Sequence, residues 1–191
     1  MPSEQDWAKL RRMIRYLQGT SDLPLILSVD KIALPKWWID GSHAVNGDLQ
    51  GQSRACMSFG KGSVISGSTK QKINTRSLTK TKLVATDDYM PMLFWTNYFL
   101  PDQGYDCTNT LLFQDNQSTI LLEKNGKLSS SRRTKHLKIR YFFVTDKIND
   151  GELTVEYCPS SKMIAAFFTK PLQGKFFLKF HKLVMNHEQS S

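Results

Sequence analysis

The sequence predicts an α/β domain in which helices flank a mixed sheet. Short apolar or alternating segments, typical of strands, follow one another along the 191-residue chain with longer segments of helical periodicity between them. Hydrophobic residues make up 40% of the chain, so it is able to form a real core, and general disorder is excluded.

The first part of the chain predicts one helix followed by strands. An apolar stripe at three- and four-residue spacing predicts a helix over residues 5–18, which Gly19 ends. The stripe consists of Trp7, Leu10, Ile14 and Leu17. Gly60-Lys61 predicts a hairpin between two of the strands. The predicted strands are 24–29, 34–40, 53–59, 62–68 and 71–77.

The rest of the chain alternates between helices and strands. A long helix is predicted over 79–100, and Pro91 within it is expected to kink or split it. Further helices are predicted at 117–124, 136–149, 162–169 and 174–186, and further strands at 109–114 and 152–157. This order favours an antiparallel meander followed by right-handed crossovers to parallel strands.

Two aspartates follow predicted strands directly. Asp40 ends 34–40 and Asp115 comes after 109–114. Functional groups gather at the carboxyl ends of parallel strands, and carboxylate oxygens are the ligands that Mg²⁺ takes. The pair is therefore a candidate for a shared metal site. The alternative is that each aspartate only forms a turn.

The net charge of +9 is concentrated in three basic runs. Residues 61–82 hold six lysines and arginines and no acid, 123–140 hold seven and one acid, and 159–187 hold five lysines and no acid. Such runs favour a polyanion, most commonly nucleic acid, as the partner. Solvated faces without a partner are the alternative.

The sequence also predicts the cellular compartment of the protein. The N-terminus is polar with no apolar stretch after it, so we expect an intracellular protein, cytoplasmic or nuclear and not secreted. No apolar run approaches the roughly 18 residues of a membrane span, so no membrane partner is expected. The three widely spaced cysteines fit neither a disulfide framework nor a zinc site.

Several motifs, in this order, resemble the ribonuclease H domain at the end of copia-type retrotransposon polyproteins. The matching segments are LRRMIRYLQGTSDLPLIL from Leu10, WWIDGSHA from Trp37, SGSTKQ from Ser66, QDNQSTI from Gln114, RTKHLKIRYFF from Arg133 and TKPL from Thr169. The resemblance covers about residues 5–186. It implies an RNase H-like fold with a five-stranded mixed sheet flanked by helices. We expect a lead-in helix and turn at 1–22, the RNase H-like domain at 23–172 and a C-terminal helix and tail at 173–191.

The resemblance also implies a mechanism. Members of this class cut the RNA strand of RNA–DNA hybrids with Mg²⁺ ions held by four carboxylates. Asp40 and Asp115 match the first and third of these carboxylates. Where the family has a glutamate for the second, this sequence has Lys82, within LTKTKL. Where the family has the fourth, an aspartate before Phe-Phe-Thr-Lys, it has Ala166. Magnesium binding is therefore expected to be weakened or lost.

The RTKH region supplies the candidate phosphate-binding groups, and a solvated face is again the alternative. These residues are Arg132, Arg133, Lys135, His136, Lys138 and Arg140. Lys80 and Lys82 both stand at positions where the family has acids. A polyanion partner is therefore indicated mainly by the run 123–140 rather than by the run 61–82.

Three functions remain open from the sequence. The first is an RNase H-type endonuclease that is degenerate or barely active, and the second is a non-catalytic domain that binds hybrid or duplex nucleic acid. The third is a structural remnant of a Pol polyprotein. An upstream reverse transcriptase domain is a further partner that the resemblance implies.

Overall fold

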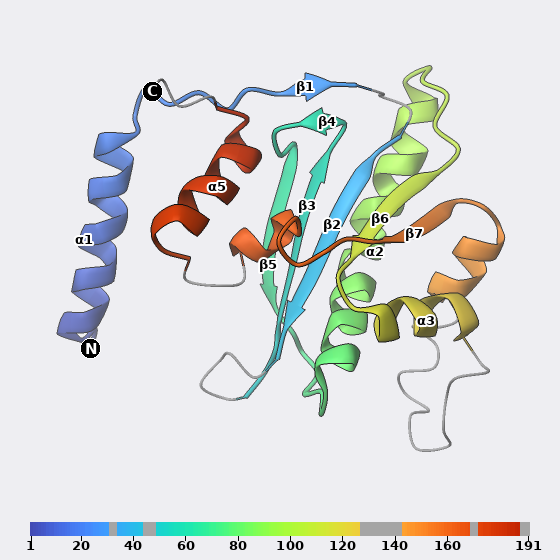
Figure 1. Ribbon diagram of the computed structural model, residues 1–191, viewed down its shortest axis with the longest axis horizontal. Helices are drawn as coiled ribbons and strands as arrows, with labels where there is room; N and C mark the ends of the chain where they lie inside the picture. Colours follow the sequence, from blue (N-terminus) through green and yellow to red (C-terminus); the bar gives the residue numbers. More distant parts are fainter. Residues whose placement is uncertain (31–33, 44–48, 127–142, 169–171, 188–191) are drawn as a thin grey trace.

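A five-stranded mixed sheet forms the centre of the protein (Figure 1). The computed structural model describes residues 1–30, 34–43, 49–126, 143–168 and 172–187. The strand order is β5-β3-β2-β6-β7. The strands are β2 (Lys36–Ser42), β3 (Gln52–Ser58), β5 (Ile65–Lys70), β6 (Thr110–Gln114) and β7 (Leu153–Tyr157). The first three pair antiparallel, and β2, β6 and β7 run parallel. The predicted meander and parallel strands are thereby confirmed, with the five-stranded mixed sheet of an RNase H-like fold.

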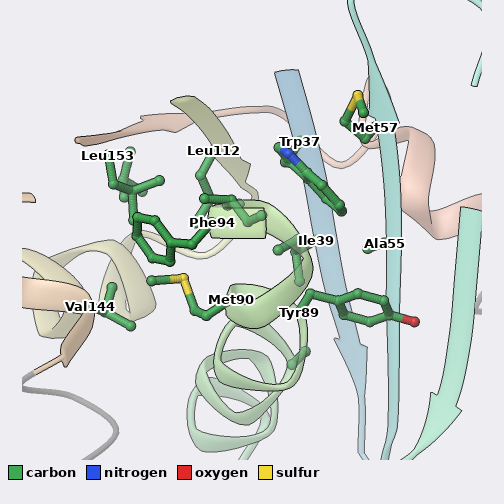
Figure 2. Packing of buried hydrophobic residues seen from close by; sticks show 13 residues of the cluster. Trp37, Ile39, Ala55, Met57, Tyr89, Met90, Phe94, Leu112, Val144 and Leu153 are labelled. Atoms are coloured by element: carbon green, nitrogen blue, oxygen red, sulfur yellow. The ribbon is translucent and has the colours of Figure 1, made fainter. Parts of the chain in front are cut away.

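Helix α2 (Leu78–Asp102) lies across one face of the sheet and forms the core with it. In Figure 2 its side chains Met90 and Phe94 extend toward the strands, which contribute Trp37, Ile39 and Leu112. All five of these residues are buried. Apolar residues alternate along the strands and recur at helical spacing on α2, which is why these segments pair across this interface.

Pro91 does not divide α2, which is a single helix over its whole length. Proline removes one backbone donor and would favour a break. Met90, Leu93 and Phe94, which lie near it, are buried against the same sheet, so packing favours a continuous helix across Pro91. The predicted helix at 117–124 is confirmed as α3 (Gln117–Asn125), capped by the Asn116 side chain. Of the predicted helix 136–149, residues 143–149 are helical and the rest lies outside the described residues.

Several of the predicted elements differ from the structure. The strand predicted at 62–68 begins later and is β5 (Ile65–Lys70). The strand predicted at 24–29 is reduced to β1 (Ser28–Val29), because the Ile26 N–H donates to the Met185 carbonyl at the end of α5 instead of to a strand. Gly60-Lys61 is not only a turn but a short strand, β4 (Gly60–Lys61), which pairs with β1. The hairpin between β3 and β5 is confirmed, with Met57 opposite Ile65.

The strand predicted at 71–77 is wrong. The Gln71 side chain is fully buried and donates hydrogen bonds to the Ser53 hydroxyl and the Thr81 carbonyl, both at 2.9 Å. These bonds turn the chain toward the start of α2. The helix predicted at 162–169 is a short 3-10 helix, η3 (Ile164–Phe168), entered through a bond from the Ala166 N–H to the Met163 carbonyl.

Two terminal helices complete the fold. Helix α5 (Gly174–Met185) packs beside η3, and its end is joined to the sheet region by a hydrogen bond from the Ser63 N–H to the Val184 carbonyl. Helix α1 (Glu4–Gly19) has no buried residue and stands apart in Figure 1. Its described contacts reach α5, where the Tyr16 hydroxyl lies 2.7 Å from the His181 ring. Within the described ranges, no helix has the length and apolarity needed to span a membrane.

A buried carboxyl group lies between α3, α2 and β6. Glu123 is fully buried, and its Oε1 accepts a hydrogen bond from the Thr86 hydroxyl at 2.9 Å. That hydroxyl in turn accepts from the Gln114 side chain at 2.8 Å. Burial raises the pKa of Glu123 from its ordinary value of 4.5 to about 8, although the Thr86 hydrogen bond acts in the opposite direction. The carboxyl is therefore protonated in the folded protein at neutral pH.

This group makes stability depend on pH. Between about pH 4.5 and 8 the folded state holds a proton on Glu123 that the unfolded state has released. The free energy of unfolding therefore decreases as pH rises through this range. We expect Glu123→Gln, which keeps the shape and cannot ionise, to remove this dependence. The free energy of unfolding in urea at pH 5, 6.5 and 8 tests it: wild type should lose stability relative to the variant by up to roughly 1.4 kcal/mol per pH unit. A difference that stays constant over this range would contradict the assignment.

Candidate functional site

The two strand-end aspartates come together as the sequence predicts. Strands β2 and β6 are parallel neighbours, with Trp38 opposite Phe113. Asp40 and Asp115 each lie two residues beyond this pair, so both carboxylates stand at the same edge of the sheet. Asp40 is 5% exposed, and the side chain of Asp115 is 13% exposed.

A glycine allows the start of α2 to approach this edge. A Cβ atom on Gly41 would lie 2.7 Å from the Thr81 carbonyl oxygen and 3.1 Å from the Lys82 Cα. Real Cβ atoms do not tolerate such contacts, so only glycine permits the strand and the helix to come this close. The close approach places the Lys82 side chain beside Asp40.

Lys82 forms ion pairs with both aspartates. Its Nζ donates to Asp40 Oδ1 and to Asp115 Oδ1, the latter at 2.5 Å. The Lys82 side chain is only 6% exposed. Burial lowers the pKa of this ammonium group, but the charges and hydrogen bonds of Asp40 and Asp115 outweigh burial and raise the pKa above its ordinary value. Lys82 is therefore a permanent cation between the two carboxylates.

One further contact to this cluster was not predicted. The Ser160 hydroxyl donates to Asp115 Oδ2 at 2.9 Å, so both oxygens of that carboxylate have partners. Ser160 lies 45 residues along the chain, directly after β7 and its closing Pro159, and nothing in its local sequence marks it. Only the parallel pairing of β6 with β7 brings it to this edge.

A cavity of about 500 Å³ opens at the cluster. It is lined by Asp40, Gly41, Ser42, His43, Leu78, Lys82, Asp115, Asn116 and Ser160. Ala166, which the resemblance predicts to stand at the position of the fourth family carboxylate, is not among these lining residues. It lies on η3 and packs with Cys158, Met163 and Trp38 on the sheet face. The methyl group at this position is thus part of an apolar cluster.

The neighbouring acids on α2 do not compensate. Asp88, six residues after Lys82, accepts a hydrogen bond from the Ser53 hydroxyl at 2.6 Å and does not line the cavity. In the part of the chain that the structure describes, no group of three or more histidine, cysteine, aspartate or glutamate side chains is arranged to hold a metal ion. The predicted phosphate-binding residues, Arg132 to Arg140, lie outside the described residues.

Comparison with known proteins supports the resemblance that the motifs indicate. No family model matches the sequence. The chain is 27% identical over 187 residues to the retrovirus-related Pol polyprotein from transposon TNT 1-94 of Nicotiana tabacum, a match covering 97% of this chain and 14% of the relative. It is 25% identical over 186 residues to the corresponding polyprotein from transposon RE2 of Arabidopsis thaliana, covering 96% of this chain and 13% of the relative. The similarity to copia-type Pol polyproteins is therefore confirmed over nearly the whole chain, which spans about one seventh of these relatives.

Among solved structures, the chain is similar to RNase H1 from the archaeon Halobacterium salinarum, with a TM-score of 0.46 and 15% identity over 71% of this chain and 93% of that protein. The RNase H-like fold of this chain is seen directly in its own sheet order and flanking helices.

The Lys82 ion pairs should be a large contributor to stability. Lys82→Met leaves two buried carboxylates side by side without a counter-charge, so we expect a loss of about 3–5 kcal/mol in the free energy of unfolding at pH 7. Urea denaturation measures it. Lys80→Met on the same helix turn is the matched control and should stay within about 0.5 kcal/mol of wild type.

A rescue variant shows whether the loss of stability in Lys82→Met comes from uncompensated charge or from altered packing. Adding Asp40→Asn and Asp115→Asn to Lys82→Met removes the uncompensated charges and should recover a large part of the loss. If Lys82→Met proves as harmless as Lys80→Met, the buried ion pairs do not exist in solution.

Proposed function

We propose that this chain is an RNase H-like domain of a retrotransposon Pol polyprotein that binds nucleic acid but does not cleave RNA–DNA hybrids. The observation that carries the proposal is the Lys82 ammonium between Asp40 and Asp115. These are the two family carboxylates that this sequence retains, and each of them is already paired with a cation.

The residues at this site do not fit Mg²⁺. Metal-dependent hydrolysis of the RNase H type needs carboxylates whose oxygens are free to bind the ion. Here Lys82 replaces one ligand and pairs with two others, and Ala166 supplies no oxygen. An ammonium group about 4 Å from a cation opposes it by about 4 kcal/mol per unit of charge at an effective dielectric of about 20. We therefore derive no metal-dependent step for this chain.

Binding of nucleic acid is supported by charge. The basic run 123–140 carries seven lysines and arginines against the single acid Glu123, which is protonated at neutral pH because it is buried. Its net positive charge is a suitable complement for a phosphate backbone. An RNA–DNA hybrid is the partner we propose, because the site motifs are those of a hybrid-cleaving class. The structural remnant of a polyprotein, which binds nothing, is the second candidate.

Restoring the missing carboxylates tests the proposed loss of catalysis. Wild type should show no cleavage of a labelled hybrid with Mg²⁺ or Mn²⁺, whereas Lys82→Glu combined with Ala166→Asp should cleave it. The double variant should also gain thermal stability when Mg²⁺ is added, because three or four unpaired carboxylates repel one another until a cation binds. Wild type should show no such gain.

The control is Asp115→Asn. Added to the double variant, it should abolish the regained cleavage. If wild type itself cleaves the hybrid and Asp115→Asn stops that cleavage, the chain is an active enzyme and the proposal of inactivity is wrong.

Salt dependence tests the binding part. Fluorescence anisotropy with an RNA–DNA hybrid should show affinity that falls steeply between 50 and 200 mM salt. Arg133→Gln with Arg140→Gln should reduce the slope of log K against log salt by about 1–2, since two phosphate contacts are removed. The matched control, Arg11→Gln with Arg15→Gln on α1, should leave it unchanged. Failure of hybrid, double-stranded RNA and double-stranded DNA to bind at low salt would leave the structural remnant as the function.

A further inference from the structure

A second cavity lies between α5 and the β3–β5 hairpin, which contains β4. Its volume is about 390 Å³. Figure 1 shows α5 beside this end of the hairpin, and the Ser63–Val184 backbone hydrogen bond, at 2.8 Å, ties the two together. The lining residues come from β2, the β3–β5 hairpin, η3, α5 and the residues just after it. The cavity is therefore walled by elements that pack on each other, and it is preformed.

The floor of this cavity is apolar. Trp38 from β2, Ile164 from η3 and Leu183 from α5 line it. Trp38 is held in place by stacking on Phe113, with ring centroids 5.0 Å apart and an angle of 22° between the planes. A fixed aromatic surface in a concave site is suited to a flat ring of a ligand.

The rim is positively charged. Lys61 from β4 and Lys179 and Lys182 from α5 all line the cavity, together with His187. Lys179 and Lys182 are three residues apart on the helix, so they lie on the same side of it. Lys179 also donates to the Ser161 carbonyl at 2.9 Å, which fixes its direction.

These lysines have no acidic partner among the described residues. None of the three forms a salt bridge there, and the sequence from 159 to 187 contains no aspartate or glutamate. Asp30, the acid next to the hairpin, pairs with Lys36 at 2.5 Å. The lining therefore carries an excess of positive charge, which is complementary to a phosphate.

We propose that this cavity binds a nucleotide unit, with its base on the apolar floor at Trp38 and its phosphate at Lys61 and Lys182. The described lining of this cavity includes no residue of the cavity at Asp40 and Asp115 and none of the run 123–140, on which the proposed hybrid binding depends, so the two proposals concern different residues. A free nucleotide and the end of a nucleic-acid strand present the same chemistry to it.

Isothermal titration of the full chain with adenosine 5′-monophosphate tests the proposal. Binding should be measurable, and both adenosine, which lacks the phosphate, and inorganic phosphate, which lacks the ring, should bind at least tenfold more weakly. Lys61→Gln with Lys182→Gln should weaken nucleotide binding about tenfold, because two charge-assisted contacts are removed. The control pair Lys72→Gln with Lys80→Gln carries the same change in net charge and should alter binding less than twofold.

A second variant tests the floor. Leu183→Gln, at a partly exposed position, should weaken binding of the nucleotide but not of inorganic phosphate, since only the base contacts this surface. If a 5′-phosphorylated single-stranded oligonucleotide competes with adenosine 5′-monophosphate, the ligand is the end of a nucleic-acid strand. If it does not compete, the ligand is a free nucleotide. Equal binding of phosphate and nucleotide, or equal effects of the two lysine pairs, would overturn the proposal. Loss of hybrid binding alone would not affect it.

Discussion

The buried pairing of Lys82 with Asp40 and Asp115 is the constraint on which the rest of the structure depends. Two carboxylates at the end of adjacent parallel strands repel each other, and burial increases that repulsion. The Lys82 ammonium pairs with both carboxylates from the first turns of α2 and cancels one of the two negative charges. It does so only because Gly41 lets the helix approach the strand. The same contact therefore fixes the start of α2 against the sheet and, as we propose, closes the site to a metal ion.

Helix α2 contributes both to the hydrophobic core and to the candidate site. One face of this helix buries Met90, Leu93 and Phe94 against β2, β3 and β6, and its start carries Lys82 to the sheet edge. The core thus places the ammonium as rigidly as it would place a metal-binding carboxylate. We propose that Lys82 reverses the charge at one position of a family active site whose strand and helix arrangement is retained. Loss of catalysis with retention of the fold is the physical consequence we propose.

The two cavities differ in the charge of the residues that line them. At the carboxyl ends of β2 and β6 the Lys82 ammonium cancels one of the two carboxylate charges and occupies one oxygen of each carboxylate, which weakens the attraction for a second cation. Between α5 and the β4 hairpin the charges of Lys61 and Lys182 are not compensated by described acids, so that surface is prepared for an anion.

The sequence by itself determined most of the elements and both retained aspartates, because alternation, helical periodicity and strand-end position are local properties. Its resemblance to the copia-type family also predicts that Lys82 and Ala166 stand where that family has carboxylates. Tertiary structure alone decided that Lys82 pairs with both aspartates, that Ser160 joins them, and that residues 24–29 and 71–77 bond to α5, Ser53 and Thr81 rather than extend the sheet. The reason is that each of these contacts joins residues far apart in the chain, and their partners are chosen by the packing of helices on the sheet.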